Sequence, residues 1–219
     1  MSKVKSPFLV YPEFISPKIC EDLISKVGFA NPNFNSDGDP TKIERHYLEG
    51  EDLIYSKFKS IVPDIEEKYD ATFKGAEKML FQMYPENQKI PAEQPGCENA
   101  KFLRKKWVKV KDVDLVGILW LKNFADTAPI DPRSEVYGGK LEFPVYNFSF
   151  TPQAGTLVIF PAGPHFITAI SPILVGSLYQ VKFGICISPN DGSGMWMYNP
   201  ANFPASKKGF IESWFREHM

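Results

Sequence analysis

Several residues of this chain have side chains that could do chemistry, and they fall in three segments. Tyr84 is followed twelve residues later by the run Gly96-Cys97-Glu98, whose Glu98 supplies a carboxylate. His165 comes five residues after Phe160, and Lys182 comes seventeen residues after His165. Carboxylate, imidazole and ammonium groups are the ones that proteins use for proton transfer, metal binding and pairing with anions. Which of these chemistries applies depends on the elements that position the groups.

The segments that carry these residues are typical of short β-strands. From Lys78 onward, strand-like runs cover residues 79–84, 113–121, 138–144, 155–161 and 176–188. The run 113–121, VDLVGILWL, is apolar except for Asp114, which predicts a strand buried on both faces. The last three runs open with Gly, and turn signals recur every 8–15 residues. This spacing favours a sandwich or a barrel.

The N-terminal third and the extreme C-terminus are instead typical of helices. After a short strand at Phe8–Tyr11, Ser16-Pro17 begins a helix that Gly28 ends. A second helix is expected from about Glu51 to Tyr69, with a kink or a break at Pro63. A last helix is expected at about residues 206–217, packed on the outside of the sheet. The sequence therefore predicts an α+β fold with its helices segregated from the strands.

In their order and spacing, three segments together resemble the 2-oxoglutarate/Fe(II) oxygenase superfamily. They are Tyr84 with residues 95–99, the run 137–144, and the run 155–161 continued by His165 and residues 176–182. The similarity is greatest to the prolyl-4-hydroxylase-like branch, particularly its small phage versions, and it covers about residues 78–188. GGKLEFP and GTLVIFP, about ten residues apart, are its most specific part. The resemblance implies a double-stranded β-helix (a jelly-roll, cupin-like barrel) with N-terminal helices packed on one sheet and a C-terminal helix.

The resemblance also implies an iron site, in which two imidazoles and one carboxylate bind Fe(II). The H-x-D/E motif of the family falls on residues 96–98, where Glu98 offers the carboxylate but Gly96 replaces the first histidine. Cys97 would point to the opposite face of a regular strand. His165 occupies the place of the distal histidine. Glu98 and His165 are therefore the expected metal ligands, the alternatives being a solvated turn carboxylate and a histidine that caps a backbone carbonyl.

The chain has two further histidines, of which only His46 is a candidate for the vacant position. His46 lies in the N-terminal region and would have to reach the metal from outside the barrel. His218 is expected to be exposed at the chain end.

The same resemblance implies a basic residue that pairs with the far carboxylate of 2-oxoglutarate. Many relatives have Arg after the Gly of the last strand, but this chain has Leu178 there. Lys182 has the same strand parity as Leu178 and Gln180, and it would act as a single point charge rather than a bidentate fork. Tyr84 and Gln180 are expected beside the cosubstrate. The alternatives are a surface lysine on an edge strand for Lys182 and a core residue for Tyr84.

Two features of the strand region have simpler interpretations. Gly138 and Gly139 are expected to allow a tight turn or a close approach of the backbone. The basic run at residues 104–111, which contains Trp107, could contact a polyanion with the indole stacked on a base. The favoured interpretation is a solvated loop at the barrel mouth or an edge strand protected by charge.

Composition restricts the class of protein. A chain of 219 residues with 43% hydrophobic residues is expected to form one domain, made of a helical layer (1–75), a jelly-roll core (76–190) and a C-terminal loop and helix (191–219). The net charge of −1 gives no electrostatic argument for nucleic-acid or membrane binding by the whole surface. The N-terminus has no secretory pattern, no apolar run could span a bilayer, and three distant cysteines indicate reduced thiols. These features predict a cytoplasmic protein, in the host cytoplasm if it is viral.

Three functions follow from this altered site. The first is an oxidoreductase, a 2-oxoglutarate/Fe(II)-dependent dioxygenase that hydroxylates a substrate which the sequence does not identify. The second is a catalytically degenerate member that keeps the barrel as a binding or assembly module. The third is another chemistry at a metal held by Glu98, His165 and water. Substrate and oligomeric state are not readable from the sequence.

Overall fold

The computed structural model describes residues 6–28, 43–86, 99–103, 106–133, 135–144, 147–163 and 166–190. Two helices and fifteen strands are assigned in these ranges. The elements are β1 (Leu9–Tyr11), α1 (Pro17–Val27), β2 (Ile43–Arg45), α2 (Leu48–Tyr69), β3 (Ala71–Ala76), β4 (Leu80–Tyr84), β5 (Ala100–Leu103), β6 (Lys106–Lys109), β7 (Leu115–Trp120), β8 (Asn123–Phe124), β9 (Glu135–Gly138), β10 (Leu141–Phe143), β11 (Phe148–Phe150), β12 (Leu157–Pro161), β13 (Ala169–Ile170), β14 (Ile173–Val175) and β15 (Leu178–Pro189).

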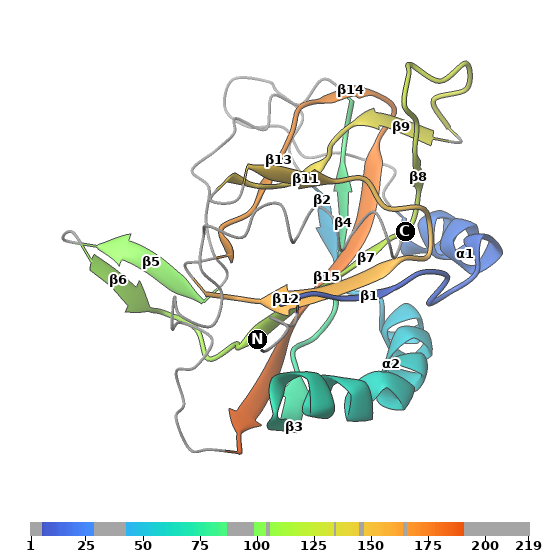
Figure 1. The fold of residues 1–219 in the computed structure, drawn as a ribbon. Coiled ribbons are helices and arrows are strands. Elements are labelled where there is room, and N and C mark those ends of the chain that lie inside the picture. Colours follow the sequence, from blue (N-terminus) through green and yellow to red (C-terminus); the bar gives the residue numbers. More distant parts are fainter. Residues whose placement is uncertain are drawn as a thin grey trace.

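The largest sheet has seven strands in the order β1-β12-β7-β15-β4-β2, with β3 paired to the far end of β15 (Figure 1). All the pairs in this major sheet are antiparallel. The twelve-residue β15 organises the sheet, because β4 pairs with its first part, β3 pairs with its last part and β7 follows its other edge. The strand expected at residues 113–121 is confirmed as β7, and every residue of β7 is buried.

Two small three-stranded sheets, β11-β10-β13 and β14-β9-β8, lie against one face of the major sheet (Figure 1). Their buried residues pack with residues of β7, β12 and β15 in one cluster, here called the inner cluster, which includes Phe143, Phe150 and Trp120. The turn between β9 and β10 uses the two glycines as expected, because Gly138 and Gly139 have φ of 84° and 68°. A Cβ at Gly138 would lie 2.2 Å from the carbonyl oxygen of Pro172, so the backbone also approaches closely there.

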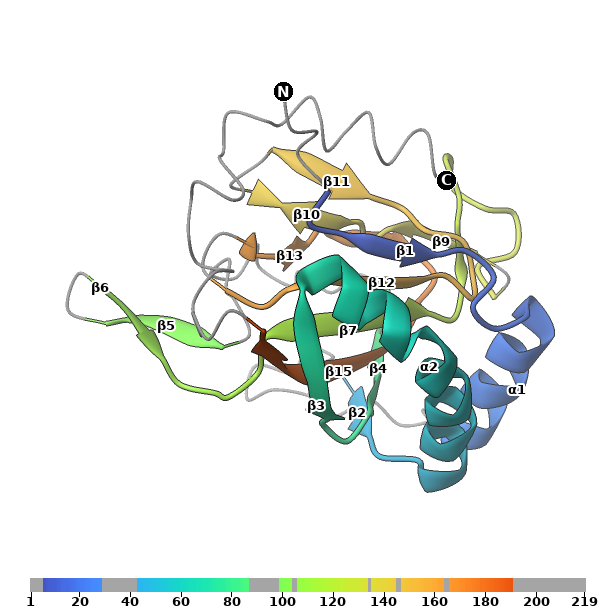
Figure 2. The ribbon, with the colours of Figure 1, turned by 60° about the horizontal axis from the view of Figure 1, so that its bottom comes forward.

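The two helices cover the opposite face of the major sheet (Figure 2). Helix α1 begins where the sequence predicts, since the Ser16 hydroxyl accepts a hydrogen bond from the Ile19 N–H and Pro17 occupies the first turn. It ends at Gly28, which is left-handed with φ of 71°. The apolar sides of both helices join sheet residues such as Phe81 and Phe183 in a second cluster, here called the helix-side cluster.

Helix α2 is longer than predicted, because it begins at Leu48 and continues through Pro63 to Tyr69. Proline lacks the N–H that would bond the carbonyl four residues earlier, so Pro63 predicts a kink or a break. The helix is not broken, but it changes direction along its length (Figure 1). Buried side chains one turn apart, from Ile54 to Ile65, hold both parts against the sheet.

Strands are not confined to the part of the chain after residue 75. Strands β1, β2 and β3 come from the first 76 residues, and all three belong to the major sheet. The C-terminal helix expected at residues 206–217 lies outside the described residues. Among the helices that the structure does describe, none combines the length and the apolar character needed to cross a membrane.

Candidate functional site

Side chains of β15 and β4 alternate between the two faces of the major sheet. Val181 and Phe183 lie in the helix-side cluster, whereas Leu178 lies in the inner cluster. Because alternate residues of a strand point to the same side, Gln180 and Lys182 face the barrel interior together with Leu178. Gln180 and Lys182, two of the residues expected in the site, are therefore on the same face of β15.

A row of polar side chains crosses three neighbouring strands on this inner face. Gln180 is the register partner of Gln82, and Gln82 is the register partner of Glu44 on β2. Gln82 Nε2 donates to Glu44 Oε1 at 2.6 Å, and Gln180 Nε2 donates to Gln82 Oε1 at 2.8 Å. The Tyr84 hydroxyl also donates to Gln82 Oε1, at 3.4 Å. Glu44 thus fixes the orientation of the Gln82 amide, and the Gln82 amide fixes that of Gln180.

Gln82 is a site residue that the sequence did not predict. It is 3% exposed, as is Gln180, and a buried amide without partners is costly. The available signal was its position two residues before Tyr84, which places both side chains on one face of β4. Within a run of apolar residues, a single glutamine at such a position indicates a polar contact across the sheet.

Leu178 occupies the place where many oxygenases have arginine, and here it is fully buried. It belongs to the inner cluster, in which Trp120 and Phe150 meet edge to face at 5.4 Å between ring centroids. Phe143 and Phe160 meet in the same way at 5.1 Å. At this level of the barrel, apolar side chains therefore fill the space between the major sheet and the small sheets.

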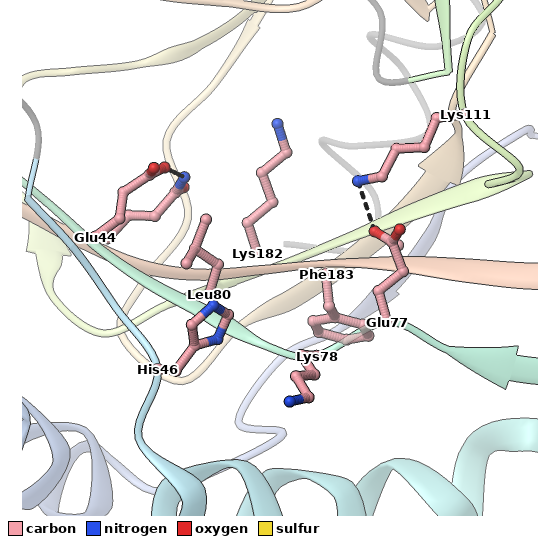
Figure 3. Close-up of a pocket in the computed structure, with 10 residues that line it drawn as sticks. Glu44, His46, Glu77, Lys78, Leu80, Lys111, Lys182 and Phe183 are labelled. Carbon is pink, nitrogen blue, oxygen red and sulfur yellow. Dashed lines mark hydrogen bonds and ion pairs between the residues drawn. The ribbon is translucent and has the colours of Figure 1, made fainter.

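Lys182 lies at a different level, on the wall of a pocket of about 380 Å³ (Figure 3). The lining residues come from β2, β4, β15 and the segments next to them: Glu44, His46, Glu77, Lys78, Leu80, Gln82, Lys111, Lys182, Phe183 and Gly184. A pocket of this volume is within the range of small-molecule sites. Tyr84 and Gln180 are not among the lining residues, so the structure places them behind the pocket, in contact with Gln82.

Charged groups of both signs border this pocket. Lys111 Nζ lies 2.7 Å from Glu77 Oε2 at one end, and Glu44 holds the Gln82 amide at the other (Figure 3). The half-buried Lys182 stands between these two ends. A Cβ added at Gly184 would lie 2.5 Å from Glu77 Oε2, so glycine at this position lets the carboxylate pack over the strand.

Lys182 is not on an edge strand, in contrast to the alternative interpretation as a surface lysine of such a strand. Strand β15 is central, and Lys182 is paired with Leu80 of β4 on one side and Ile118 of β7 on the other. Lys182 comes four positions after Leu178, which corresponds to about 13 Å along a strand. Any anion bound by Lys182 would therefore lie well away from the position of Leu178.

The expected metal ligands cannot be placed from the structure. Glu98, His165 and the altered position Gly96, with Cys97, lie outside the described residues, as does His218. Within the described ranges, no group of three or more His, Cys, Asp or Glu side chains could hold a metal ion. His46 is described and lines the pocket, with its Nδ1 3.1 Å from the carbonyl oxygen of Met79.

The described residues fit one part of the cosubstrate that the resemblance implies. A half-buried ammonium on the wall of a small pocket, as at Lys182, suits a carboxylate of 2-oxoglutarate. The residues expected to bind Fe(II) are not described, so the fit of the metal rests on Glu98 and His165 in the sequence alone.

A lysine outside the predicted site is also buried. Lys122 is 6% exposed at the end of β7, its Nζ donates to the carbonyl oxygen of Pro132 at 2.8 Å, and it lies 5.5 Å from the centroid of the Tyr179 ring. Burial lowers the pKa of this ammonium, opposed by the charge of Asp131. The contact ties the loop before β9 to the major sheet.

The major sheet, the facing small sheets and the N-terminal helices define a double-stranded β-helix, and comparison with solved structures identifies its type. A viral collagen prolyl hydroxylase from Paramecium Bursaria Chlorella virus-1, in its 2-oxoglutarate complex, is 16% identical with a TM-score of 0.57, covering 82% of this chain and 95% of its own. A Pseudomonas putida prolyl-4-hydroxylase is 14% identical with a TM-score of 0.51, covering 82% and 92%.

A third structure, a Trichoplax adhaerens prolyl hydroxylase in complex with a peptide fragment of hypoxia inducible factor, is 10% identical with a TM-score of 0.52, covering 87% of each chain. No family model and no curated protein matches the sequence. This chain therefore has the fold of the prolyl hydroxylases, which are 2-oxoglutarate/Fe(II) oxygenases, and the predicted fold class is confirmed.

Proposed function

We propose that this protein is a 2-oxoglutarate/Fe(II)-dependent dioxygenase, an oxidoreductase that hydroxylates a substrate still to be identified. The observation that supports the proposal is the position of Lys182, whose ammonium lines a pocket on the inner face of a sheet with the prolyl hydroxylase fold. Glu98 and His165 would hold the iron, with Gly96 in place of the first histidine. When bound, iron and 2-oxoglutarate would together supply the oxidising chemistry.

The chain's own residues have separate tasks in this proposal. Lys182 pairs with the far carboxylate of 2-oxoglutarate, and as a point charge it leaves the carboxylate free to rotate. Gln82, held by Glu44 at 2.6 Å, keeps the floor of the pocket rigid beside that carboxylate. Gln180 and Tyr84 support Gln82 from behind through its Oε1.

Calorimetric titration with 2-oxoglutarate, with and without Fe(II), tests this function. Lys182→Ala is expected to weaken 2-oxoglutarate binding at least tenfold, since a hydrogen bond to a charged group contributes about 1.5–3 kcal/mol. Lys59→Ala, on the exposed side of α2, is the matched control and should leave binding unchanged. Iron-dependent formation of succinate without substrate would support the dioxygenase. If Lys182→Ala binds 2-oxoglutarate as tightly as the wild type, the assignment of the pocket is overturned.

Gly96→His tests the metal half of the proposal. Loss of even a residue that supports a metal ligand costs about 10–100-fold in affinity or activity, and a missing ligand should cost more. Restoring the imidazole is therefore expected to tighten Fe(II) binding by at least tenfold and to raise succinate formation. If the variant binds iron no better than the wild type, Glu98 and His165 do not form the proposed site.

A second candidate function is a binding or assembly module without redox chemistry. The burial of Leu178 among aromatic rings favours it, because the position used by many relatives for the cosubstrate is filled. Such a module would bind an anion at Lys182 with the same affinity in the presence of iron or of a chelator. It would also form no succinate, even as the Gly96→His variant.

A further inference from the structure

Asn99 is a fully buried residue at a point where two distant segments of the chain meet. Its backbone N–H donates to the carbonyl oxygen of Ala162 at 3.4 Å. Asn99 directly precedes β5 and Ala162 directly follows β12, and the start of β5 accordingly lies beside the end of β12 (Figure 1). This hydrogen bond therefore joins two segments that are far apart in the sequence.

Both expected metal ligands are sequence neighbours of this contact. Glu98 is the residue before Asn99, and His165 comes three positions after Ala162. Consecutive Cα atoms are about 3.8 Å apart, and three residues extend the chain by at most about 11 Å. The hydrogen bond between Asn99 and Ala162 thus limits how far apart Glu98 and His165 can lie.

Asn99 is held in place by three further hydrogen bonds. Its carbonyl oxygen accepts from the backbone N–H groups of Val110 and Lys111, at 2.8 and 3.3 Å. Its side-chain Nδ2 donates to the carbonyl oxygen of Val113 at 2.7 Å. A carbonyl oxygen can only accept, so this contact requires a donor, which the amide of asparagine supplies and the carboxylate of aspartate does not.

The stretch before β7 connects this junction to the centre of the major sheet. The carbonyl oxygen of Asp114 accepts from the Ala162 N–H at 2.9 Å, which continues the antiparallel pairing of β12 with β7. The adjacent Val113 is the residue that accepts from the Asn99 amide, and Val113 is fully buried. Asn99 is therefore attached to the buried centre of the fold rather than to an exposed loop.

We propose that Asn99 is a positioning residue of the metal site, which holds the chain at Glu98 against the chain that leads from β12 to His165. With Gly96 in place of the first histidine, the site depends on the placement of the two remaining ligands. Loss of a residue that supports a metal ligand costs about 10–100-fold in affinity. The inference rests on the dioxygenase proposed above, and it assigns to Asn99 no direct contact with the metal.

Titration of the full-length protein with Co(II) tests this role, in the wild type and in the Gly96→His variant. Co(II) replaces Fe(II) without being oxidised by air, and its visible absorption reports the number and geometry of its ligands. Asn99→Ala is expected to weaken Co(II) binding about 10–100-fold and to change the absorption spectrum. The matched control is Asn123→Ala on β8, because the Asn123 Oδ1 also bonds the backbone, accepting from the Ala154 N–H at 2.8 Å. This control should leave the Co(II) affinity and spectrum unchanged.

Thermal unfolding without metal separates positioning from simple support of the fold. Both alanine variants are expected to lower the melting temperature, whereas only Asn99→Ala should lose Co(II) affinity. Asn99→Ser keeps a donor on a shorter side chain, so it should have an intermediate affinity, and it decides the question if Asn99→Ala does not fold.

Two kinds of failure can be told apart. If Co(II) binds to the parent protein and the Asn99 variants bind it as tightly, or lose no more affinity than Asn123→Ala, the role of Asn99 is overturned while the metal site stands. If neither the wild type nor Gly96→His binds Co(II), the metal site of the proposed dioxygenase is overturned, and the role of Asn99 with it.

Discussion

Leu178 and Lys182 face the same side of β15, yet Leu178 is sealed within the inner cluster and Lys182 lines an open pocket. The inner face of the major sheet is therefore divided along β15 into an apolar part and a polar part. The polar row formed by Glu44, Gln82 and Gln180 crosses the sheet at the register between them. A charged ligand can consequently contact this face of the sheet only on the Lys182 side of the row.

Moving the lysine side chain from position 182 to position 178, and leucine the other way, tests whether the inner face has separate apolar and polar parts. Leu178→Lys places an ammonium among aromatic rings without a counter-ion, and an uncompensated buried charge is expected to lower the free energy of unfolding by about 3–5 kcal/mol. Lys182→Leu, at the pocket wall, should change it by less than about 1 kcal/mol. Denaturation in urea measures both. Equal effects at the two positions would show that the apolar part is open to water.

The hydrogen bond between Gln180 and Gln82 predicts strong coupling between these residues. Gln82→Leu leaves the Gln180 amide without its acceptor in a buried place, so a loss of about 1–3 kcal/mol in unfolding free energy is expected. Gln180→Leu should cost a similar amount because it leaves Gln82 Oε1 with the long contact to Tyr84 alone.

The double variant completes this cycle. Replacing both partners by apolar side chains of similar shape can be nearly neutral, so the double variant is expected to be about as stable as either single one, or more so. Simple addition of the two single losses would mean that the glutamines act separately.

The strands around the candidate site could be predicted because their signals are local. Apolar runs are visible in the sequence, two of these three opened by Gly, and β7, β12 and β15 appear where residues 113–121, 155–161 and 176–188 predict them. The start and end of α1 are equally local, since Ser16, Pro17 and Gly28 act on their own neighbours. Strand β2 was missed because three residues next to a turn-rich segment carry no periodicity.

The contents of the barrel could not be predicted in the same way. The alternation of side chains along a strand predicts that Lys182 and Gln180 lie on one face. Whether a side chain on that face borders a cavity or packs against an aromatic ring depends on strands that are distant in sequence. Leu178 is buried in the inner cluster, to which Phe143, Phe150 and Phe166 of other segments also belong, and no local pattern indicates this. The partnership of Glu44 with Gln82 joins residues 38 positions apart and had no signal of its own.

Helix α2 lies so close to the sheet that Gly50 has no room for a side chain. A Cβ there would lie 2.6 Å from Tyr47 Cδ1 and 2.8 Å from Phe81 Cζ. Alanine favours helices over glycine by about 1 kcal/mol, but overpacking costs about 1–3 kcal/mol, so Gly50→Ala is expected to lower the melting temperature. Ser56→Ala on the exposed side of the same helix should have little effect. A Gly50→Ala protein with a raised melting temperature would show that α2 can move away from the sheet.

Two buried acidic groups predict that stability falls in alkaline solution. Burial raises the pKa of the Cys20 thiol from its ordinary value of 9.0 to about 12, opposed by backbone hydrogen bonds. Burial also raises the pKa of the Tyr69 phenol well above 10.0, with a further contribution from the nearby charge of Tyr11. The Tyr69 hydroxyl donates to the Pro7 carbonyl oxygen at 2.7 Å, which ties the start of β1 to the end of α2.

The sign follows from proton binding in the two states. Above the ordinary pKa values the unfolded chain loses these protons while the folded protein keeps them, so the unfolded state binds fewer protons and stability falls as pH rises. For Cys20 the loss extends from about pH 9 to about pH 12, and for Tyr69 it begins near pH 10. Cys20→Ala should flatten the first part of this decline. Tyr69→Phe should flatten the second, although it costs about 1 kcal/mol at neutral pH through the lost hydrogen bond. Urea denaturation at a series of pH values measures both slopes, and a decline equally steep in the double variant would place its cause in other groups.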